Sequence, residues 1–124
     1  MKATLTNYHQ SPRKVGLVAS LIRGKSVPHA RAALMYLPKK SAPVISKLLD
    51  SAIANARAMG AKTDELFVKT ITVNKGAVMR RSRPFARGRA GSVRKTMSIV
   101  YLELGQHAAP AKKSRPKKTK VEAK

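Results

Sequence analysis

The segment from Lys75 to Lys95 carries closely spaced arginines and no acidic residue. Its arginines are Arg80, Arg81, Arg83, Arg87, Arg89 and Arg94. Cationic side chains repel one another in water, and a segment this polar cannot bury enough apolar surface to fold alone. The guanidinium group is also the side chain best shaped for bidentate contacts with phosphate. The segment therefore predicts that the chain binds a polyanion.

The rest of the chain has the same charge imbalance. Lys and Arg number 27 against 5 Asp and Glu, which gives a formal net charge of +22 on 124 residues. Hydrophobic residues make up 43% with no Trp and no Cys, so we expect one aliphatic core without disulfides or thiolate metal sites. No apolar run approaches the roughly 20 residues of a membrane helix. We therefore expect a cytoplasmic protein without membrane insertion.

Helical spacing of apolar residues predicts three helices, over residues 11–24, 26–37 and 39–59. The first two open with a serine N-cap and a proline in the first turn. A glycine follows the first and the third helix, where it provides the usual left-handed cap. Pro43 fits the third helix only if it lies near the first turn, where few backbone donors are needed.

Strands are predicted over residues 2–8, 66–73 and 93–104. The last two flank the basic segment symmetrically about Phe85, which predicts a hairpin. Each complete strand of it, about 15 residues long, would measure roughly 50 Å at about 3.3 Å per residue, longer than a small body can cover. The distal part of the hairpin, over about 74–96, must therefore project from the body. We expect one globular domain over 1–104 and, from its Lys-, Ala- and Pro-rich composition, a disordered basic tail over 105–124.

The sequence gives no indication of catalysis. The histidines His9, His29 and His107 have no carboxylate nearby in sequence, and no metal-binding or phosphate-loop motif is present. The chain has 5 acidic residues, and this small number argues against paired-carboxylate catalysis. We therefore expect no catalytic residue, no metal and no cofactor.

The candidate RNA-binding residues are basic side chains on the predicted hairpin and beside the first helix. They are Arg13, Lys14, Arg23, Lys25, Lys75, Arg80, Arg81, Arg83, Arg87, Arg89, Arg94 and Lys95. A charge run can also be a solvated face, and the four residues beside the first helix fit that interpretation equally well. Pro84 and Phe85 can serve turn formation alone or stack against a base.

Three segments resemble one known family. They are Ser-Pro-Arg-Lys-Val-Gly-Leu-Val-Ala-Ser-Leu-Ile-Arg-Gly-Lys at 11–25, Ser-Ala-Ile-Ala-Asn-Ala at 51–56, and the stretch 80–89 with its Ala-Arg-Gly-Arg. In order and spacing they resemble bacterial ribosomal protein L twenty-two of the large subunit, over about residues 2–104. Phe85 stands where that family often has Arg or His, and Ile99 where a polar residue or His is usual.

The resemblance implies an α+β fold, with three helices packed on a small three-stranded antiparallel sheet and one long protruding β-hairpin. It implies binding to large-subunit ribosomal RNA, contacts with neighbouring large-subunit proteins, transient contact with the nascent polypeptide, a role in subunit assembly, and no homo-oligomer. The hairpin tip would line the exit tunnel. The tip residues would be Met79, Arg80, Arg81, Ser82, Arg83, Pro84, Phe85, Ala86, Arg87, Gly88, Arg89 and Ala90.

An architectural DNA-binding protein is the alternative function, because basic β-arms with a proline tip can also enter a minor groove. Such proteins usually present two arms from a dimer, and the apolar residues here suffice for one small core. Competition between duplex DNA and folded ribosomal RNA distinguishes the two functions.

Overall fold

The computed structural model describes residues 1–106, so nearly all of the predicted tail lies outside the described residues. The elements follow one another along the chain as β1 (Lys2–Tyr8), α1 (Pro12–Ile22), α2 (Val27–Tyr36), α3 (Ala42–Ala58), the 3₁₀ turn η1 (Thr63–Glu65), β2 (Leu66–Pro84), the 3₁₀ turn η2 (Ala86–Gly88) and β3 (Ala90–Gln106).

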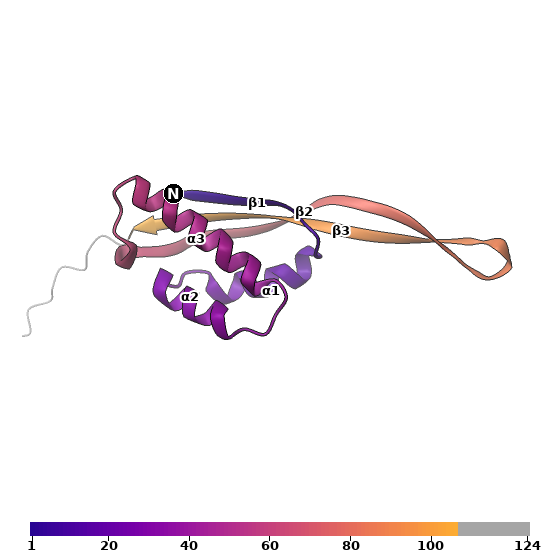
Figure 1. Ribbon diagram of the computed structural model, residues 1–124, viewed down its shortest axis with the longest axis horizontal. Coiled ribbons are helices and arrows are strands. Elements are labelled where there is room, and N and C mark those ends of the chain that lie inside the picture. Colours follow the sequence, from indigo (N-terminus) through magenta and orange to yellow (C-terminus); the bar gives the residue numbers. More distant parts are fainter. Residues whose placement is uncertain (107–124) are drawn as a thin grey trace, which may run out of the picture.

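The strands form one antiparallel sheet of three strands in the order β1-β3-β2, and the helices cover one of its faces (Figure 1). The core lies between these two layers. Ile22 and Leu49 from the helices are fully buried against Ile71 and Leu102 from the sheet. This arrangement confirms the predicted α+β fold, with three helices on a small antiparallel sheet.

The buried faces of the helices agree with the apolar spacing from which the helices were predicted. The predicted stripe of Val15, Val18, Ala19 and Ile22 is the buried face of α1. Helix α3 begins at Ala42, later than the predicted start near residue 39, so that its proline falls in the first turn. The glycines after α1 and α3, at positions 24 and 60, both have positive φ, as expected for left-handed caps.

The register of the two long strands differs from the predicted symmetry about Phe85. Leu104 pairs with Val68, and Leu66 pairs with Gln106. The pair Leu66–Gln106 is already centred on Ala86. Two bulges that each add one residue to β2 move the centre of the turn on to Arg87, and β2 has 19 residues against 17 in β3. Composition alone cannot reveal such bulges, because an extra residue leaves the apolar pattern on either side nearly intact.

Strand β3 continues to Gln106, two residues past the domain boundary expected from composition. Gly105 pairs with Phe67, and the phenylalanine ring lies over it. A Cβ atom at position 105 would stand 2.8 Å from a ring carbon, so only glycine fits without moving the ring. This close approach explains a glycine inside a strand.

Ser98 is fully buried in β3, and its hydroxyl has no hydrogen-bond partner among the described residues. A buried hydroxyl without a partner costs about 1–3 kcal/mol. We therefore expect Ser98→Ala to leave the free energy of unfolding unchanged or to raise it by up to about 1 kcal/mol in urea titrations. Ser92→Ala, at an exposed site in the same strand, is the control. A clear loss of stability in Ser98→Ala alone would show that this hydroxyl is bonded.

Candidate nucleic-acid interface

The sheet narrows to two strands where β1 ends. Pairing of β1 stops at Tyr8 opposite Ser98, and beyond that row residues 78–84 of β2 pair only with residues 90–96 of β3. This two-stranded part, residues 76–97, is called the arm below. It extends well past the helices (Figure 1), over roughly 40 Å at about 3.3 Å per residue.

The arm carries cations on both of its faces. Arg80 lies directly opposite Arg94, and paired residues in a ladder share a face. Alternate residues point to opposite faces, so Arg81 and Arg83 lie on the other face together with Lys95. Every residue from Met79 to Ala90 is exposed. The arm can therefore meet anions on both sides at once.

No acidic residue balances these cations within the described part of the arm. The ion pairs among residues 1–106 are Arg31–Asp50 at 2.6 Å and Lys69–Glu103 at 3.6 Å, and both lie in the body. Like charges directly opposite in a ladder are destabilising, as at Arg80 and Arg94. A neighbouring polyanion would remove that repulsion.

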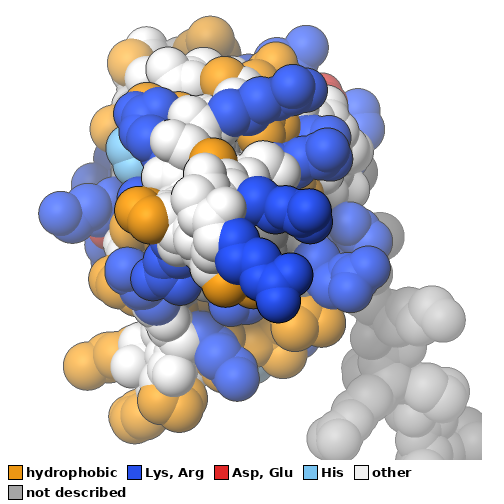
Figure 2. Space-filling model, turned by 90° about the vertical axis from the view of Figure 1, so that its right-hand side faces the viewer, with side chains coloured by type: hydrophobic (Ala, Val, Ile, Leu, Met, Phe, Trp, Pro, Cys, Tyr) orange, Lys and Arg blue, Asp and Glu red, His pale blue; other side chains and the backbone are white. Residues whose placement is uncertain are grey.

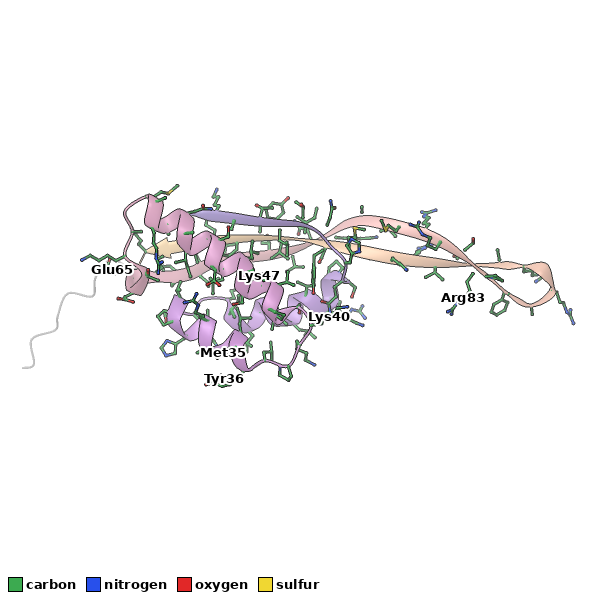
Figure 3. The ribbon with its side chains drawn as sticks, viewed as in Figure 1. Met35, Tyr36, Lys40, Lys47, Glu65 and Arg83 are labelled. Atoms are coloured by element: carbon green, nitrogen blue, oxygen red, sulfur yellow. The ribbon has the colours of Figure 1, made fainter. Side chains whose placement is uncertain are left out.

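Acidic and basic side chains are distributed unevenly along the length of the molecule. Figure 3 shows Glu65 at one end of the body and Arg83 near the far end of the arm. Figure 2, which faces the arm end, shows many Lys and Arg side chains between hydrophobic and uncharged ones, and almost no acidic side chain. The acidic residues of η1 thus lie at the end of the molecule away from the arm.

The turn at the tip is closed by backbone contacts. The amide of Phe85 donates to the carbonyl of Arg89 at 2.7 Å. Arg87 has φ of 58°, a left-handed conformation that side-chain-bearing residues seldom adopt, and Gly88 follows with φ of 70°. The backbone of Phe85 therefore serves the turn, while its ring is 71% exposed and free to contact a partner.

A hollow of about 410 Å³ lies at the root of the arm and is called the basal hollow below. It is lined by His9, Gln10, Ser11, Lys14, Lys40, Met79, Arg94, Lys95, Thr96 and Met97. The fold thus brings Lys14, from the predicted helix group, next to Arg94 and Lys95, from the predicted hairpin group. Lys40 is a lining residue that sequence reasoning missed, since its position was assigned to the start of the third helix.

The other predicted residues lie elsewhere. Arg23 donates from Nη2 to the carbonyl of Ile71 at 3.1 Å, so part of its guanidinium holds the end of α1 against β2. The carbonyl of Lys25 accepts a hydrogen bond from the amide of Val68 at 2.9 Å in the same region. Arg13 and Lys75 are exposed and do not line the basal hollow. These four predicted residues therefore lie outside the basal hollow.

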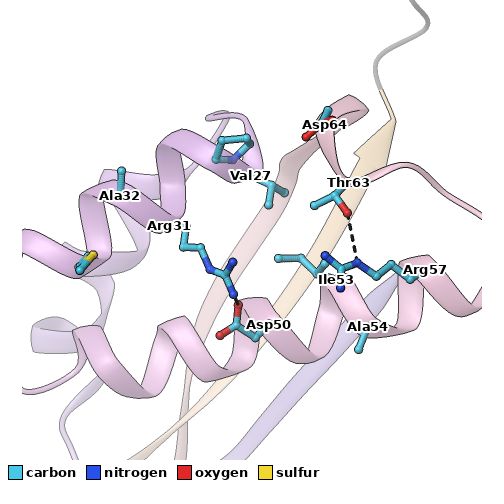
Figure 4. Close-up of a pocket in the computed structure, with 11 residues that line it drawn as sticks. Val27, Arg31, Ala32, Asp50, Ile53, Ala54, Arg57, Thr63 and Asp64 are labelled. Atoms are coloured by element: carbon cyan, nitrogen blue, oxygen red, sulfur yellow. Dashed lines mark hydrogen bonds and ion pairs between the residues drawn. The ribbon is translucent and has the colours of Figure 1, made fainter.

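A larger hollow, of about 550 Å³, lies between α2, α3 and η1 and has a different character (Figure 4). Arg31 and Asp50 form an ion pair across it, and Nε of Arg57 donates to the Thr63 hydroxyl at 3.2 Å. The lining holds two basic residues, Arg31 and Arg57, and two acidic residues, Asp50 and Asp64, so the hollow offers no surplus charge to a ligand.

Two other kinds of feature are absent from residues 1–106, a metal-binding cluster and a membrane-spanning helix. These residues contain no group of His, Cys, Asp and Glu side chains that could hold a metal ion. None of the helices in this part of the chain is long and apolar enough to cross a membrane.

Comparison with known proteins identifies the family. The family described as "Ribosomal protein L22p/L17e" matches residues 3–105, which cover the body and the whole arm. The chain belongs to this ribosomal protein family. Membership makes it a structural component of the ribosome and not an enzyme, and it confirms the predicted family and the predicted location in the cytoplasmic ribosome.

Individual relatives agree with this assignment over most of their length. The chain is 47% identical over 105 residues to "Large ribosomal subunit protein uL22" of Citrifermentans bemidjiense, a match that covers 84% of this chain and 95% of the relative. It is 47% identical over 103 residues to the protein of that name from Pelobacter propionicus, covering 82% and 93%. For Anaeromyxobacter sp. strain Fw109-5 the identity is 48% over 105 residues, covering 83% and 73%.

Proposed function

We propose that this chain is a structural protein of the large ribosomal subunit that binds large-subunit ribosomal RNA through its arm and the adjoining end of its body. The observation that carries the proposal is the two-sided display of arginines on a ribbon without acidic residues. A flat nucleic-acid surface would neutralise one face only. Folded RNA that surrounds the arm would neutralise both.

The mechanism of binding is electrostatic, with arginine supplying defined geometry. Each phosphate that a Lys or Arg neutralises releases condensed counterions, and this release drives association. Phosphate contacts position a protein without reading sequence, and RNA helices are recognised mainly by shape. The bound RNA therefore has to be folded, with phosphates converging on the arm from more than one side.

The tip, residues 79–90, is proposed to line the nascent-polypeptide exit tunnel of the subunit. Its exposure and its distance from the body support this placement, because a tip that reaches deep into RNA can border an internal passage. Phe85 adds an exposed ring at the turn, suited to stacking on a base or to brief contact with a passing polypeptide.

The same geometry supports a proposed role in subunit assembly. A cationic ribbon that enters RNA must be in place while the RNA helices close around it, so binding and RNA folding are coupled. The body remains outside the RNA and is available to neighbouring large-subunit proteins. The proposed partners are thus ribosomal RNA, adjacent ribosomal proteins and, transiently, the nascent chain.

Binding to ribosomal RNA should weaken steeply as salt is added. If about 8 phosphates are neutralised, the logarithm of the association constant should fall with the logarithm of salt concentration with a slope of about −6 to −7. Filter binding or fluorescence anisotropy over a salt series measures this slope. A slope near −2 would contradict the arm as an electrostatic contact surface.

Competition between nucleic acids tests the class of partner. We expect folded large-subunit RNA fragments to displace labelled RNA from the purified protein at much lower concentrations than duplex DNA of equal phosphate content. Equal or better competition by duplex DNA would favour an architectural DNA-binding protein and would contradict the proposed function.

A further inference from the structure

We propose that the basal hollow binds a single phosphate group of the RNA backbone, and that the bound phosphate fixes the direction of the arm relative to the body. This inference rests on the proposed function and assigns one site within it. The site uses Lys14 and Lys40 from the body and Arg94 from the arm. Lys95 also lines the hollow, but its side chain lies on the other face of the ladder.

The lining residues come from both sides of a structural junction. His9, Gln10 and Ser11 belong to the turn between β1 and α1, and Lys40 precedes α3. The residues on the opposite side, including Arg94 and Thr96, belong to the arm. A ligand held by both sides therefore connects the arm to the body.

The charged residues that line the basal hollow are all of one sign. Four of its lining residues are Lys or Arg, and none of its lining residues is Asp or Glu. The two ion pairs of the described residues involve none of these four side chains. Phosphate carries negative charge and several strong acceptor oxygens, and hydrogen bonds to ionised partners are shorter and stronger than neutral ones. The volume of about 410 Å³ admits a phosphate together with bridging waters.

The body side of the hollow is held in place before any ligand binds. The Tyr8 hydroxyl donates to Oε1 of Gln10 at 2.9 Å and approaches the carbonyl oxygen of Lys40 at 3.3 Å. Burial raises the pKa of Tyr8 above its ordinary value of 10.0, so this hydroxyl keeps its proton. The amide of Ala42 donates to the carbonyl of Lys39 at 2.9 Å, which turns the chain at Lys40. The body side of the hollow therefore loses less conformational freedom when phosphate binds.

The arm side of the basal hollow is held in place less firmly than the body side. The bulge between Lys75 and Val78 interrupts the β2–β3 ladder at the level where β1 stops pairing. A ribbon of two strands is at best marginally stable in water, and bulges bend and twist a strand. The direction of the arm is therefore weakly determined by the ladder alone, and a phosphate bridge at its root would restrict it.

The test is a titration of the full-length protein with inorganic phosphate at constant ionic strength, with chloride as the balancing anion. Backbone amide NMR shifts report binding at Gln10, Lys40 and Thr96. We expect saturable shifts at these positions for the unmodified chain. The double variant Lys40→Gln/Arg94→Gln should weaken the phosphate affinity by about tenfold or more, as expected for two charge-assisted hydrogen bonds. The matched control, Lys47→Gln/Lys62→Gln, changes two exposed lysines outside the hollow and should bind as the unmodified chain does.

A separate measurement, the distance between two spin labels, tests whether phosphate fixes the direction of the arm. The chain has no cysteine, so spin labels at Ser82→Cys and Ala54→Cys report one distance between the arm and α3. Phosphate should narrow the distribution of that distance in the otherwise unmodified chain and leave it unchanged in the Lys40→Gln/Arg94→Gln background. A distribution that phosphate does not narrow would overturn the fixing of the arm.

A third set of measurements distinguishes the source of the phosphate. Oligouridylate should displace inorganic phosphate from the hollow, which supports an RNA backbone phosphate as ligand. Saturation by inorganic phosphate without displacement by oligouridylate would overturn the RNA assignment. Equal phosphate affinity in the double variant and the control would overturn the site itself. Failure of the proposed function is separate, because it would appear as loss of binding to folded ribosomal RNA by the unmodified chain.

Discussion

The variant with Arg80, Arg81 and Arg83 all replaced by alanine is expected to unfold at the temperature of the unmodified protein and yet to be missing from large ribosomal subunits. These side chains are exposed, and Arg81 makes only a contact to the neighbouring carbonyl of Arg80, at 2.9 Å. Their removal takes nothing from the core but removes three cations from both faces of the arm. The slope of RNA affinity against salt should become shallower by about 2 to 3.

Calorimetry of the free variant and sedimentation of cell extracts measure the two halves of this expectation. The matched control replaces Lys2, Lys47 and Lys62, three exposed lysines of the body, by alanine. It lowers the net charge equally and should still enter subunits. A fall in the unfolding temperature of the arginine variant would show that these side chains support the folded body, contrary to the role proposed for them.

Leu102→Ala should have the opposite pattern, a large loss of stability from a single substitution. Leu102 is 1% exposed in the central strand, opposite Ala3 of β1 and Ile71 of β2. Truncating a buried leucine costs about 2–5 kcal/mol, since the lost contacts leave a cavity. In a domain of this size, each kcal/mol lowers the unfolding midpoint by about 4–8 °C.

Urea and thermal unfolding of the purified variant measure this loss. Val93→Ala is the control, because Val93 is 38% exposed on the arm and its truncation should change the free energy of unfolding by less than about 0.5 kcal/mol. Equal losses in the two variants would mean that the arm is as much a part of the cooperative unit as the core, which the account does not allow.

The local elements of this fold could be predicted from sequence because their signals are local. The stripe of Val15, Val18, Ala19 and Ile22 predicts the buried face of α1 directly. Pro43 limits where α3 can begin, although the predicted start still included Lys40. Each of these inferences depends on residues within one or two helical turns.

The register and the basal hollow could not be predicted in this way. Symmetry about Phe85 places Leu66 opposite Leu104, whereas Leu66 pairs with Gln106. The two bulges shift the pairing further and leave composition unaltered, so the turn is centred on Arg87 and not on Phe85. The hollow joins residues from the start of α1, the loop before α3 and the root of the arm, and no spacing rule connects these segments. The grouping of Lys14 with Arg94 becomes visible only in three dimensions.

The most direct test of the account is trypsin cleavage within the arm, compared between the free protein and intact large subunits. Trypsin cuts after Lys and Arg, and the arginines between residues 80 and 94 are exposed in the free chain. The account predicts rapid cleavage there in the purified protein and protection of the same bonds in the subunit, where RNA surrounds the arm. Equally rapid cleavage in intact subunits would contradict it.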